Sequence, residues 1–208
     1  MTSRRTPTGA AVLQPQVTAA ITEAALDELA EAGYGRLSME AVAKRAGVGK
    51  SALYRRWPAK QDMVLAVVAE LGVPMAATPD TGSLRGDLLA ALTAFRDFLT
   101  HPRFARIVPD LIAESARRPE LGVAMAELLG EPRRARGAVL LRRAIERGEL
   151  PADTDLELAL DLVAAPVFWR LVARRAPQEE GYLDSVVEFL LRGLSAGAPA
   201  LIHGEGGR

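Results

Sequence analysis

Residues 38–60 read SMEAVAKRAGVGKSALYRRWPAK, and this stretch decides what fold is expected for the N-terminal part of the chain. It contains six lysines and arginines and a single acidic residue, Glu40, whereas the whole chain balances 26 basic against 26 acidic side chains. All three lysines of the chain lie within it. A basic N-terminal part on an otherwise acidic chain favours a polyanionic partner, with a solvated charged face as the alternative interpretation.

The same stretch has the form of two short helices joined by a glycine turn, which is the minimal helix-turn-helix. The helices are expected at about 39–46 and 49–56, and Gly47 can adopt the left-handed backbone that the turn requires. Ser38 can cap the first helix. Pro58 ends the second, because the residue before a proline is disfavoured in helical conformation.

The outer face of the second helix carries groups that suit double-stranded DNA. When its apolar residues pack inward, four side chains face outward: Lys50, Ser51, Tyr54 and Arg55. Lysine and arginine can donate to guanine edges or phosphates, and tyrosine and serine can bond phosphates. Lys60 lies in the first turn of the next helix, where exposed N–H groups already favour a phosphate.

Residues 37–64, LSMEAVAKRAGVGKSALYRRWPAKQDMV, resemble the DNA-binding signature of the tetracycline-repressor (TetR) family of bacterial transcription regulators. The matching features are the Ala-Gly-Val turn at 46–48, the Leu-Tyr pair at 53–54 and the corner at 58–60. The specific resemblance covers about residues 16–66. Two positions depart from it: many relatives carry Ser or Thr in place of Gly49, and Phe in place of Trp57.

The resemblance implies an all-α fold with an N-terminal helix-turn-helix DNA-binding domain and a C-terminal helical ligand-binding and dimerisation domain. It implies operator DNA, a second copy of the chain and a small-molecule effector as partners. The candidate DNA-binding residues are Ser38, Lys50, Ser51, Tyr54, Arg55, Arg56 and Lys60. Trp57 is expected to be structural.

Composition limits the remaining classes of protein. The hydrophobic fraction is 49%, which is enough for a core, and the chain has no cysteine, which excludes disulfides and thiolate metal sites. No segment has the form of a signal peptide, and no apolar run approaches the ~20 residues needed to span a bilayer. A cytoplasmic protein without membrane contact is therefore expected.

Only helical patterns follow the N-terminal part. We expect helices at about 16–32 and 59–71, then 84–100, 103–117, 119–130, 132–148, 155–175 and 179–195. The predicted organisation is a flexible arm at 1–14, a DNA-binding domain at 15–72, a linker, an effector-binding and dimerisation domain at 83–196, and a flexible tail at 197–208.

The last two helices carry wide apolar faces. Their members are Leu158, Leu162, Val163 and Val167 on one, and Leu183, Val186, Val187, Leu190 and Leu194 on the other. Two such helix pairs from two chains would make a four-helix interface. The stripes alone do not distinguish this interface from the core of a single chain.

Aromatic residues of the C-terminal part are the candidates for a ligand site: Phe95, Phe98, Phe104, Phe168 and Trp169. Polar residues near them in sequence are Asp97, His101, Asp110, Glu114 and Arg170. An apolar cavity with a few polar groups is what a ligand site needs, and ordinary core packing is the alternative. Pro166 is expected to kink its helix, because it removes one backbone hydrogen bond.

An enzyme is not expected. The chain has only two histidines, His101 and His203, and it lacks a glycine-rich phosphate loop and a metal-ligand motif, so no catalytic residue, metal or cofactor is predicted. The arginines of 132–148 are interpreted as a solvated helix face or, alternatively, as a second basic surface. The sequence thus predicts a homodimeric regulator, a repressor released from a palindromic operator by a small molecule. The alternative is a DNA-binding dimer without an effector.

Overall fold

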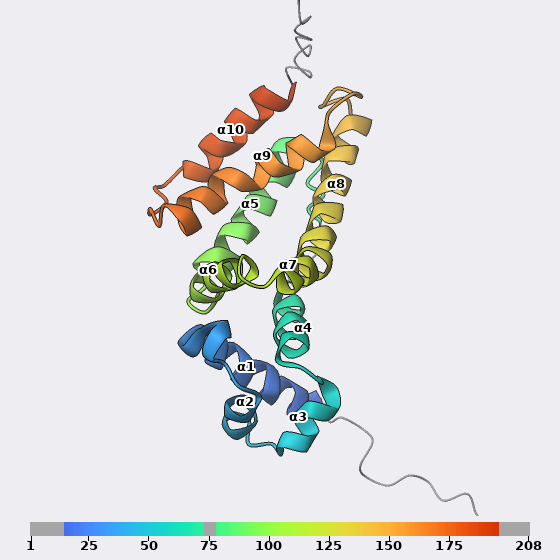
Figure 1. The fold of residues 1–208 in the computed structure, drawn as a ribbon. Helices are drawn as coiled ribbons and strands as arrows, with labels where there is room; N and C mark the ends of the chain where they lie inside the picture. The colour runs from blue at the N-terminus through green and yellow to red at the C-terminus, as the bar shows by residue number, and fades with distance from the viewer. Residues whose placement is uncertain (1–14, 73–77, 196–208) are drawn as a thin grey trace, which may run out of the picture. The chain divides into compact units, whose positions relative to one another are not determined.

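The computed structural model describes residues 15–72 and 78–195, and throughout these residues the regular structure is helical, without a strand (Figure 1). The predicted arm at 1–14 and tail at 197–208 lie outside the described residues, as does the centre of the predicted linker. No described helix combines the length and the apolar character needed to cross a membrane. The all-α fold expected from the sequence is confirmed.

The elements follow the predicted order closely. They are α1 (Pro15–Arg36), α2 (Met39–Arg45), α3 (Lys50–Arg56), α4 (Lys60–Gly72), α5 (Leu84–Thr100), α6 (Phe104–Ser115), α7 (Pro119–Met125), η1 (Ala126–Gly130), α8 (Glu131–Glu146), α9 (Leu156–Phe168), η2 (Trp169–Ala173) and α10 (Tyr182–Ser195). The two η elements are π-helical turns that end the expected helices at 119–130 and 155–175. Each was expected to be α-helical to its end.

The chain divides into two compact units. The first contains the residues up to Leu71 together with 106–125, and the second contains 72–105 together with the residues from Ala126 onward. This division differs from the expected domain boundary at the linker, because most of α6 and all of α7 group with the helix-turn-helix. Sequence order alone did not indicate this excursion.

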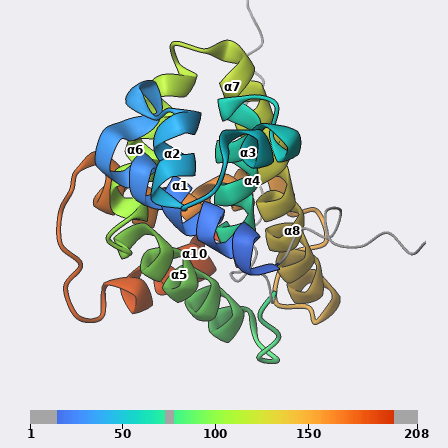
Figure 2. The same ribbon diagram turned by 90° about the horizontal axis from the view of Figure 1, so that it is seen from below.

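The first unit is built around the helix-turn-helix (Figure 2). The Ser38 hydroxyl accepts the N–H of Ala41 at 3.1 Å, which confirms the predicted cap of α2. Gly47 has a φ of 67°, and a Cβ at this position would meet no atom within 4 Å, so the glycine is needed for its conformation rather than for space. Val42 and Leu53, both fully buried, pack on the two sides of this turn.

The second unit has α5 as its central helix. Its buried residues recur at helical spacing: Leu84, Leu88, Leu92, Phe95 and Leu99. α8, α9 and α10 all pack against α5. On α10 the buried residues are Leu183, Val186, Val187 and Leu190, so most of the apolar stripe predicted on that helix belongs to the core of the single chain.

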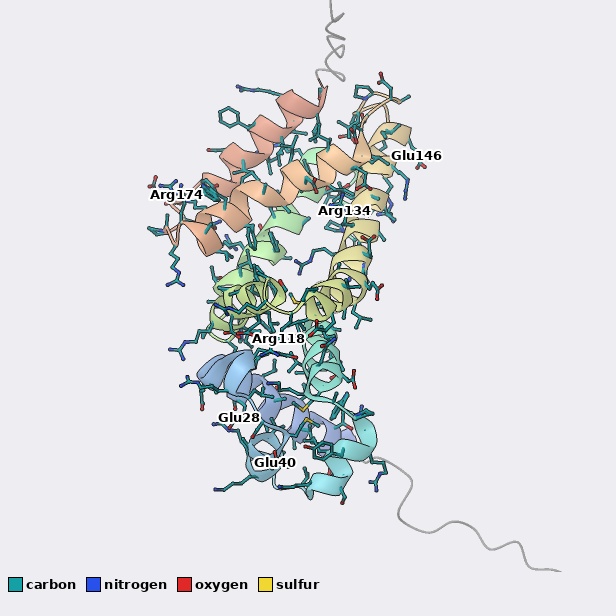
Figure 3. All side chains as sticks on the ribbon, viewed as in Figure 1. Glu28, Glu40, Arg118, Arg134, Glu146 and Arg174 are labelled. Carbon is teal, nitrogen blue, oxygen red and sulfur yellow. The ribbon has the colours of Figure 1, made fainter. Side chains whose placement is uncertain are left out.

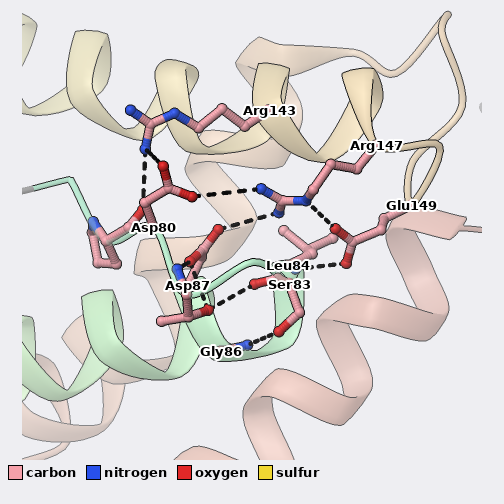
Figure 4. Close-up of polar contacts among 10 residues, drawn as sticks. Asp80, Ser83, Leu84, Gly86, Asp87, Arg143, Arg147 and Glu149 are labelled. Atoms are coloured by element: carbon pink, nitrogen blue, oxygen red, sulfur yellow. Dashed lines mark hydrogen bonds and ion pairs between the residues drawn. The ribbon is translucent and has the colours of Figure 1, made fainter.

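A buried carboxylate ties the start of α5 to the end of α8 (Figure 4). Asp87 is fully buried and accepts the backbone N–H of Thr81 at 2.6 Å and the Arg147 guanidinium at 3.2 Å. Arg147 also pairs with Glu149, which accepts the N–H of Leu84 at 2.6 Å. Burial by itself would raise the pKa of Asp87, but the hydrogen bonds from Thr81 and Arg147 outweigh it and hold that pKa below its usual value.

Asp87→Ala should therefore lower the free energy of unfolding by about 3 kcal/mol at pH 7, because it leaves Arg147 and the Thr81 N–H without their acceptor. A lowered folded-state pKa stabilises the protein above the unfolded-state value of about 3.9 and loses its effect as the pH falls through the folded-state value. The difference between the wild type and the variant should stay constant from about pH 7 to 5 and shrink below about pH 4. Denaturant unfolding at one fixed protein concentration measures both effects.

Asp80→Ala is the matched control. Asp80 is mostly exposed and lies 3.5 Å from Arg143 and 4.0 Å from Arg147. An exposed pair of this kind contributes less than about 1 kcal/mol. Equal losses of stability in the two variants would show that Asp87 does not hold the two helices together.

Candidate nucleic-acid interface and ligand cavity

The outward face of α3 is the open part of the helix-turn-helix. Lys50, Ser51 and Arg55 are exposed, and Tyr54 is 43% exposed although it is a large aromatic residue. The spacing of these four residues places them on one side of the helix. Arg55 forms neither a hydrogen bond nor an ion pair with any residue in the described ranges. We call the face formed by Lys50, Ser51, Tyr54 and Arg55 the recognition face.

Lys50 is the member of the recognition face that has an intramolecular partner. Its ammonium lies 3.0 Å from a carboxylate oxygen of Glu40 on α2 (Figure 3 labels Glu40). Both side chains are at least half exposed. The hydrogen bond from Lys50 lowers the pKa of Glu40. Since an exposed pair of this kind is weak, it can exchange for a phosphate or a base edge.

Two other basic residues of the stretch have structural partners instead. Arg45 binds Glu28 at 2.8 Å and Glu31 at 2.6 Å, which joins α2 to α1. Arg56 donates to the hydroxyl of Thr18 on α1, and its guanidinium lies 4.8 Å from the centre of the Trp57 ring. Trp57 is buried, in agreement with the structural role expected for it. Part of the local charge surplus therefore holds the three-helix head together.

Lys60 also points to the protein rather than outward. Its ammonium donates to the carbonyl of Tyr34 at 2.7 Å and lies 4.5 Å from the centre of the Tyr34 ring. Burial lowers the pKa of Lys60, and the nearby Arg118 adds to the effect. The structure therefore gives this side chain a main-chain partner where the sequence suggested a phosphate. Ser38, used as a helix cap, has a structural role as well.

Tyr34 stands at a corner where α1 meets α6. Gly33 has a φ of 76°, as expected for the residue that stops the regular part of α1. The next N–H, that of Tyr34, donates to a carboxylate oxygen of Asp110 at 2.7 Å. A Cβ at Gly33 would lie 2.9 Å from the other carboxylate oxygen, so the contact also depends on the glycine. Asp110 and Glu114, suggested by the sequence as polar groups of a ligand site, instead belong to this first unit.

The second unit contains an apolar cavity of about 630 Å³. This volume is in the range of small-molecule sites. Its walls come from α5, α8, α9 and the segment before α5: Thr78, Pro79, Ala91, Leu92, Ala94, Phe95, Gly130, Arg133, Arg134, Arg136, Gly137, Leu140, Leu160, Asp161, Val163, Ala164, Ala165 and Phe168. Two of the five aromatic residues predicted for a ligand site, Phe95 and Phe168, are among them.

The other three aromatic candidates lie elsewhere. Phe98 and Phe104 stack on each other, with ring centres 4.5 Å apart, and neither lines the cavity. Trp169 is 62% exposed at the start of the π-helical turn η2. The helix continues past Pro166 to Phe168, so the proline does not turn the residues that follow it into the cavity.

The arginines of α8 are the lining residues that sequence reasoning placed wrongly. Arg133, Arg134 and Arg136 line the cavity, whereas the sequence suggested a solvated face or a second basic surface. A signal was available: Arg133, Gly137 and Leu140 recur at helical spacing, and a glycine beside arginines on one face makes room at that face. The burial of that face depends on α5 and α9, which lie far away in the sequence.

An apolar surface remains uncovered on α9 and α10. Leu158 is 52% exposed, Leu162 46% and Phe189 77%. A groove between the two helices is lined by Leu162, Pro166, Val186, Phe189, Leu190, Gly193 and Leu194. The α9 part of the predicted dimer stripe is thus open in the single chain, and Phe189 joins it from α10. We call Leu158, Leu162, Pro166 and Phe189 the α9–α10 face.

Comparison with known proteins decides the family. Residues 21–67 match the family model described as "Bacterial regulatory proteins, tetR family", and residues 78–190 match "Tetracyclin repressor-like, C-terminal domain". The chain belongs to the TetR family. It is thus a DNA-binding transcriptional regulator and not an enzyme, as the resemblance of residues 37–64 implied.

Relatives of this TetR-family chain match it along most of its length. An uncharacterised HTH-type regulator of Bacillus subtilis, YdeS, is 29% identical over 85% of this chain and 89% of its own. A DNA-binding transcriptional repressor of Mycobacteroides abscessus is 30% identical over 83% of this chain and 90% of its own. The crystal structure of the TetR-family regulator SCO0332 has a TM-score of 0.70 and 33% identity, and the match covers 88% of this chain and 100% of that one.

Proposed function

We propose that the protein is a homodimeric repressor that binds a palindromic operator through its recognition face and is released when a small molecule fills the cavity of the second unit. The cavity is the observation that carries the effector part of this proposal, because a core without a ligand would be filled by side chains. Since operator DNA is the target, the protein would act in the cytoplasm.

The recognition face supports DNA binding in an orthodox geometry. In helix-turn-helix proteins the second helix enters the major groove and the first crosses the backbone. α3 is the second helix, and it presents two cationic side chains, a hydroxyl and a phenol without burying any of them. Lys50 and Arg55 are assigned to base edges or phosphates, and Ser51 and Tyr54 to phosphates.

Existing bonds make structural roles a better assignment for Ser38, Arg56 and Lys60. Their polar atoms already cap α2, bind α1 and cap the carbonyls at the α1 corner, respectively. A contact with DNA would have to replace these bonds. We therefore assign operator contact to the four residues of the recognition face and the positioning of α3 to the other three.

The α9–α10 face supports association of two copies. Exposed phenylalanine and leucine side chains gathered beside an apolar groove are a usual sign of an interaction site. A second copy is the proposed occupant, because a two-fold axis brings the same face of both chains together and gives a four-helix contact. Trp169, seven residues after Leu162, continues the exposed stripe on η2 and is assigned to this surface rather than to the ligand.

Ligand binding would reach the DNA-binding part through the chain itself. α4 ends at Gly72, and the chain forms part of the cavity wall at Thr78 and Pro79. Arg143 holds this segment by contacts with the Pro79 carbonyl at 3.4 Å and Asp80 at 3.5 Å. A ligand can change operator affinity only if it binds two conformations unequally, and a wall segment that continues into α4 provides that link.

Footprinting of the purified protein on operator DNA tests the proposal. The expected footprint is a palindrome with half-site centres about 34–36 Å apart, or a multiple of that distance. A small-molecule library is then screened for compounds that weaken operator binding, in parallel on the wild type and on Ala94→Trp, in which the cavity is filled. A compound that acts on the wild type alone is the expected result.

Two outcomes would contradict the proposal in different ways. A footprint confined to a single half-site would count against the dimer. Compounds that act equally on both proteins would place the effector site outside the cavity, and the failure of a broad library on a well-defined operator would favour the effector-free alternative.

A further inference from the structure

The charged groups of the cavity are unevenly balanced. Three arginines, Arg133, Arg134 and Arg136, share the lining with one acidic residue, Asp161. Apart from the Thr78 hydroxyl, the remaining lining side chains are apolar or absent. The cavity therefore combines an apolar body with an excess of positive charge supplied by one helix, α8.

The single acid of the cavity is already used. Arg134 donates to Asp161 at 2.6 Å and also pairs with Glu157, so that this arginine is neutralised by α9 (Figure 3 labels Arg134). Arg134 and its two acids form a closed, exposed group. The excess of positive charge in the cavity lining thus comes from Arg133 and Arg136.

Arg133 and Arg136 are one helical turn apart, and their charges interact. The Arg133 guanidinium lies 5.1 Å from the centre of the Phe95 ring and 5.4 Å from that of Phe98, at the aromatic end of the cavity. Although part of this residue is exposed, burial lowers the pKa of Arg133, and the charge of Arg136 lowers it further. Arg136 donates to the Pro132 carbonyl at 3.0 Å, and in the described part of the chain it has no ion pair.

Two like charges beside an apolar cavity are mutually unfavourable, and an anion between them changes the sign of the interaction. An acidic group placed there would relieve the repulsion and accept charge-assisted hydrogen bonds, which are among the strongest that proteins form. Planar guanidinium groups match the geometry of a carboxylate or sulfonate. The apolar remainder of such a ligand would lie along Leu92, Leu140 and Val163.

We infer that the effector is an amphipathic organic anion, whose acidic group is bound by Arg133 and Arg136 and whose apolar body fills the cavity between α5, α8 and α9. This inference rests on the proposed effector role of the cavity. It names the chemical class of ligand and the two residues that select it. A neutral molecule of the same shape would not relieve the repulsion between the two arginines and would bind more weakly.

Two fluorescent probes with the same aromatic body test this selection. 1-Anilinonaphthalene-8-sulfonate carries a sulfonate, and N-phenyl-1-naphthylamine lacks it. Both are titrated against the wild type, Arg133→Gln and Arg136→Gln, and against Arg142→Gln as a matched control. Arg142 is an exposed arginine of the same helix that does not line the cavity.

Each of the two lining substitutions should weaken binding of the sulfonate about tenfold and leave binding of the neutral probe within about twofold. Arg142→Gln should change neither. Ala94→Trp and Ala164→Trp, which fill the cavity at two different points, should remove both probes, and circular dichroism shows which of them keeps the native helix content. Decanoate should displace the sulfonate, and 1-decanol at equal concentration should do so less effectively.

The inference is overturned if sulfonate binding is insensitive to both lining arginines, if both probes weaken equally, or if the filled variants still bind the sulfonate. Operator affinity is measured in the same samples to separate this result from the proposed function. Charge-selective binding with unchanged operator affinity would count against release by ligand and leave the ligand class standing. Release by a neutral compound without charge selection would do the opposite.

Discussion

Phe189→Asp is expected to convert the protein into a folded monomer that binds its operator about 10²- to 10⁴-fold more weakly. Phe189 is 77% exposed in the single chain, so the substitution removes little from that chain's own core. In the proposed dimer the same side chain is buried, and an aspartate there would be desolvated opposite a symmetry-related charge. The loss of affinity follows because each head would bind its half-site without the other.

Light scattering and operator titration measure the two parts of this result, and circular dichroism checks the fold. Leu128→Asp is the matched control, because Leu128 is 52% exposed on η1 and lies outside the α9–α10 face. The control should remain dimeric with unchanged operator affinity. A Phe189→Asp protein that stays dimeric would show that the two copies meet through another surface.

Arg55→Glu is expected to reduce operator affinity at least about 100-fold while leaving the dimer and its stability intact. Arg55 is exposed and forms no bond with the described residues, so the folded chain gives up no interaction when it is replaced. On DNA the substitution removes one charge-assisted contact per head and places a carboxylate against phosphates or base edges. A symmetric dimer experiences the change twice, and each tenfold step corresponds to about 1.4 kcal/mol.

Arg142→Glu changes the net charge by the same amount on α8 and serves as the control, with less than about a threefold effect expected. Lys60→Met provides a second contrast. Because the Lys60 ammonium is bonded to the Tyr34 carbonyl, this substitution should lower thermal stability rather than the salt dependence of operator binding. Should Lys60→Met flatten the salt dependence by about one unit per head and Arg55→Glu have no effect, the assignment of contacts would have to be reversed.

Local signals account for the parts of the fold that were predictable. Ser38, Gly47 and Pro58 act through their own backbone or through residues three or four positions away, and their roles as cap, turn and stop could be derived without a tertiary structure. Helix positions followed from periodicity in the same way, since one buried face per helix is enough to produce the pattern. The π-helical turns η1 and η2 left no comparable mark.

The candidate sites were predictable only in part, because a side chain's partner is decided by contacts distant in sequence. Lys60 belongs to the basic stretch by position, but its ammonium reaches Tyr34, 26 residues earlier. Phe95 and Phe98 occupy neighbouring turns of one helix, yet only Phe95 lines the cavity. The aromatic character that suggested a ligand site was common to both residues.

The sequence by itself determined the all-helical fold, the helix-turn-helix and membership of the TetR family, because these depend on spacing over a few residues and on a short signature. Only the tertiary structure decided which charges remain open to DNA, that α8 directs Arg133 and Arg136 toward a cavity, and that Phe189 is left uncovered. Periodicity shows that a helix has an apolar and a polar face, but which neighbour covers each face depends on how distant segments pack.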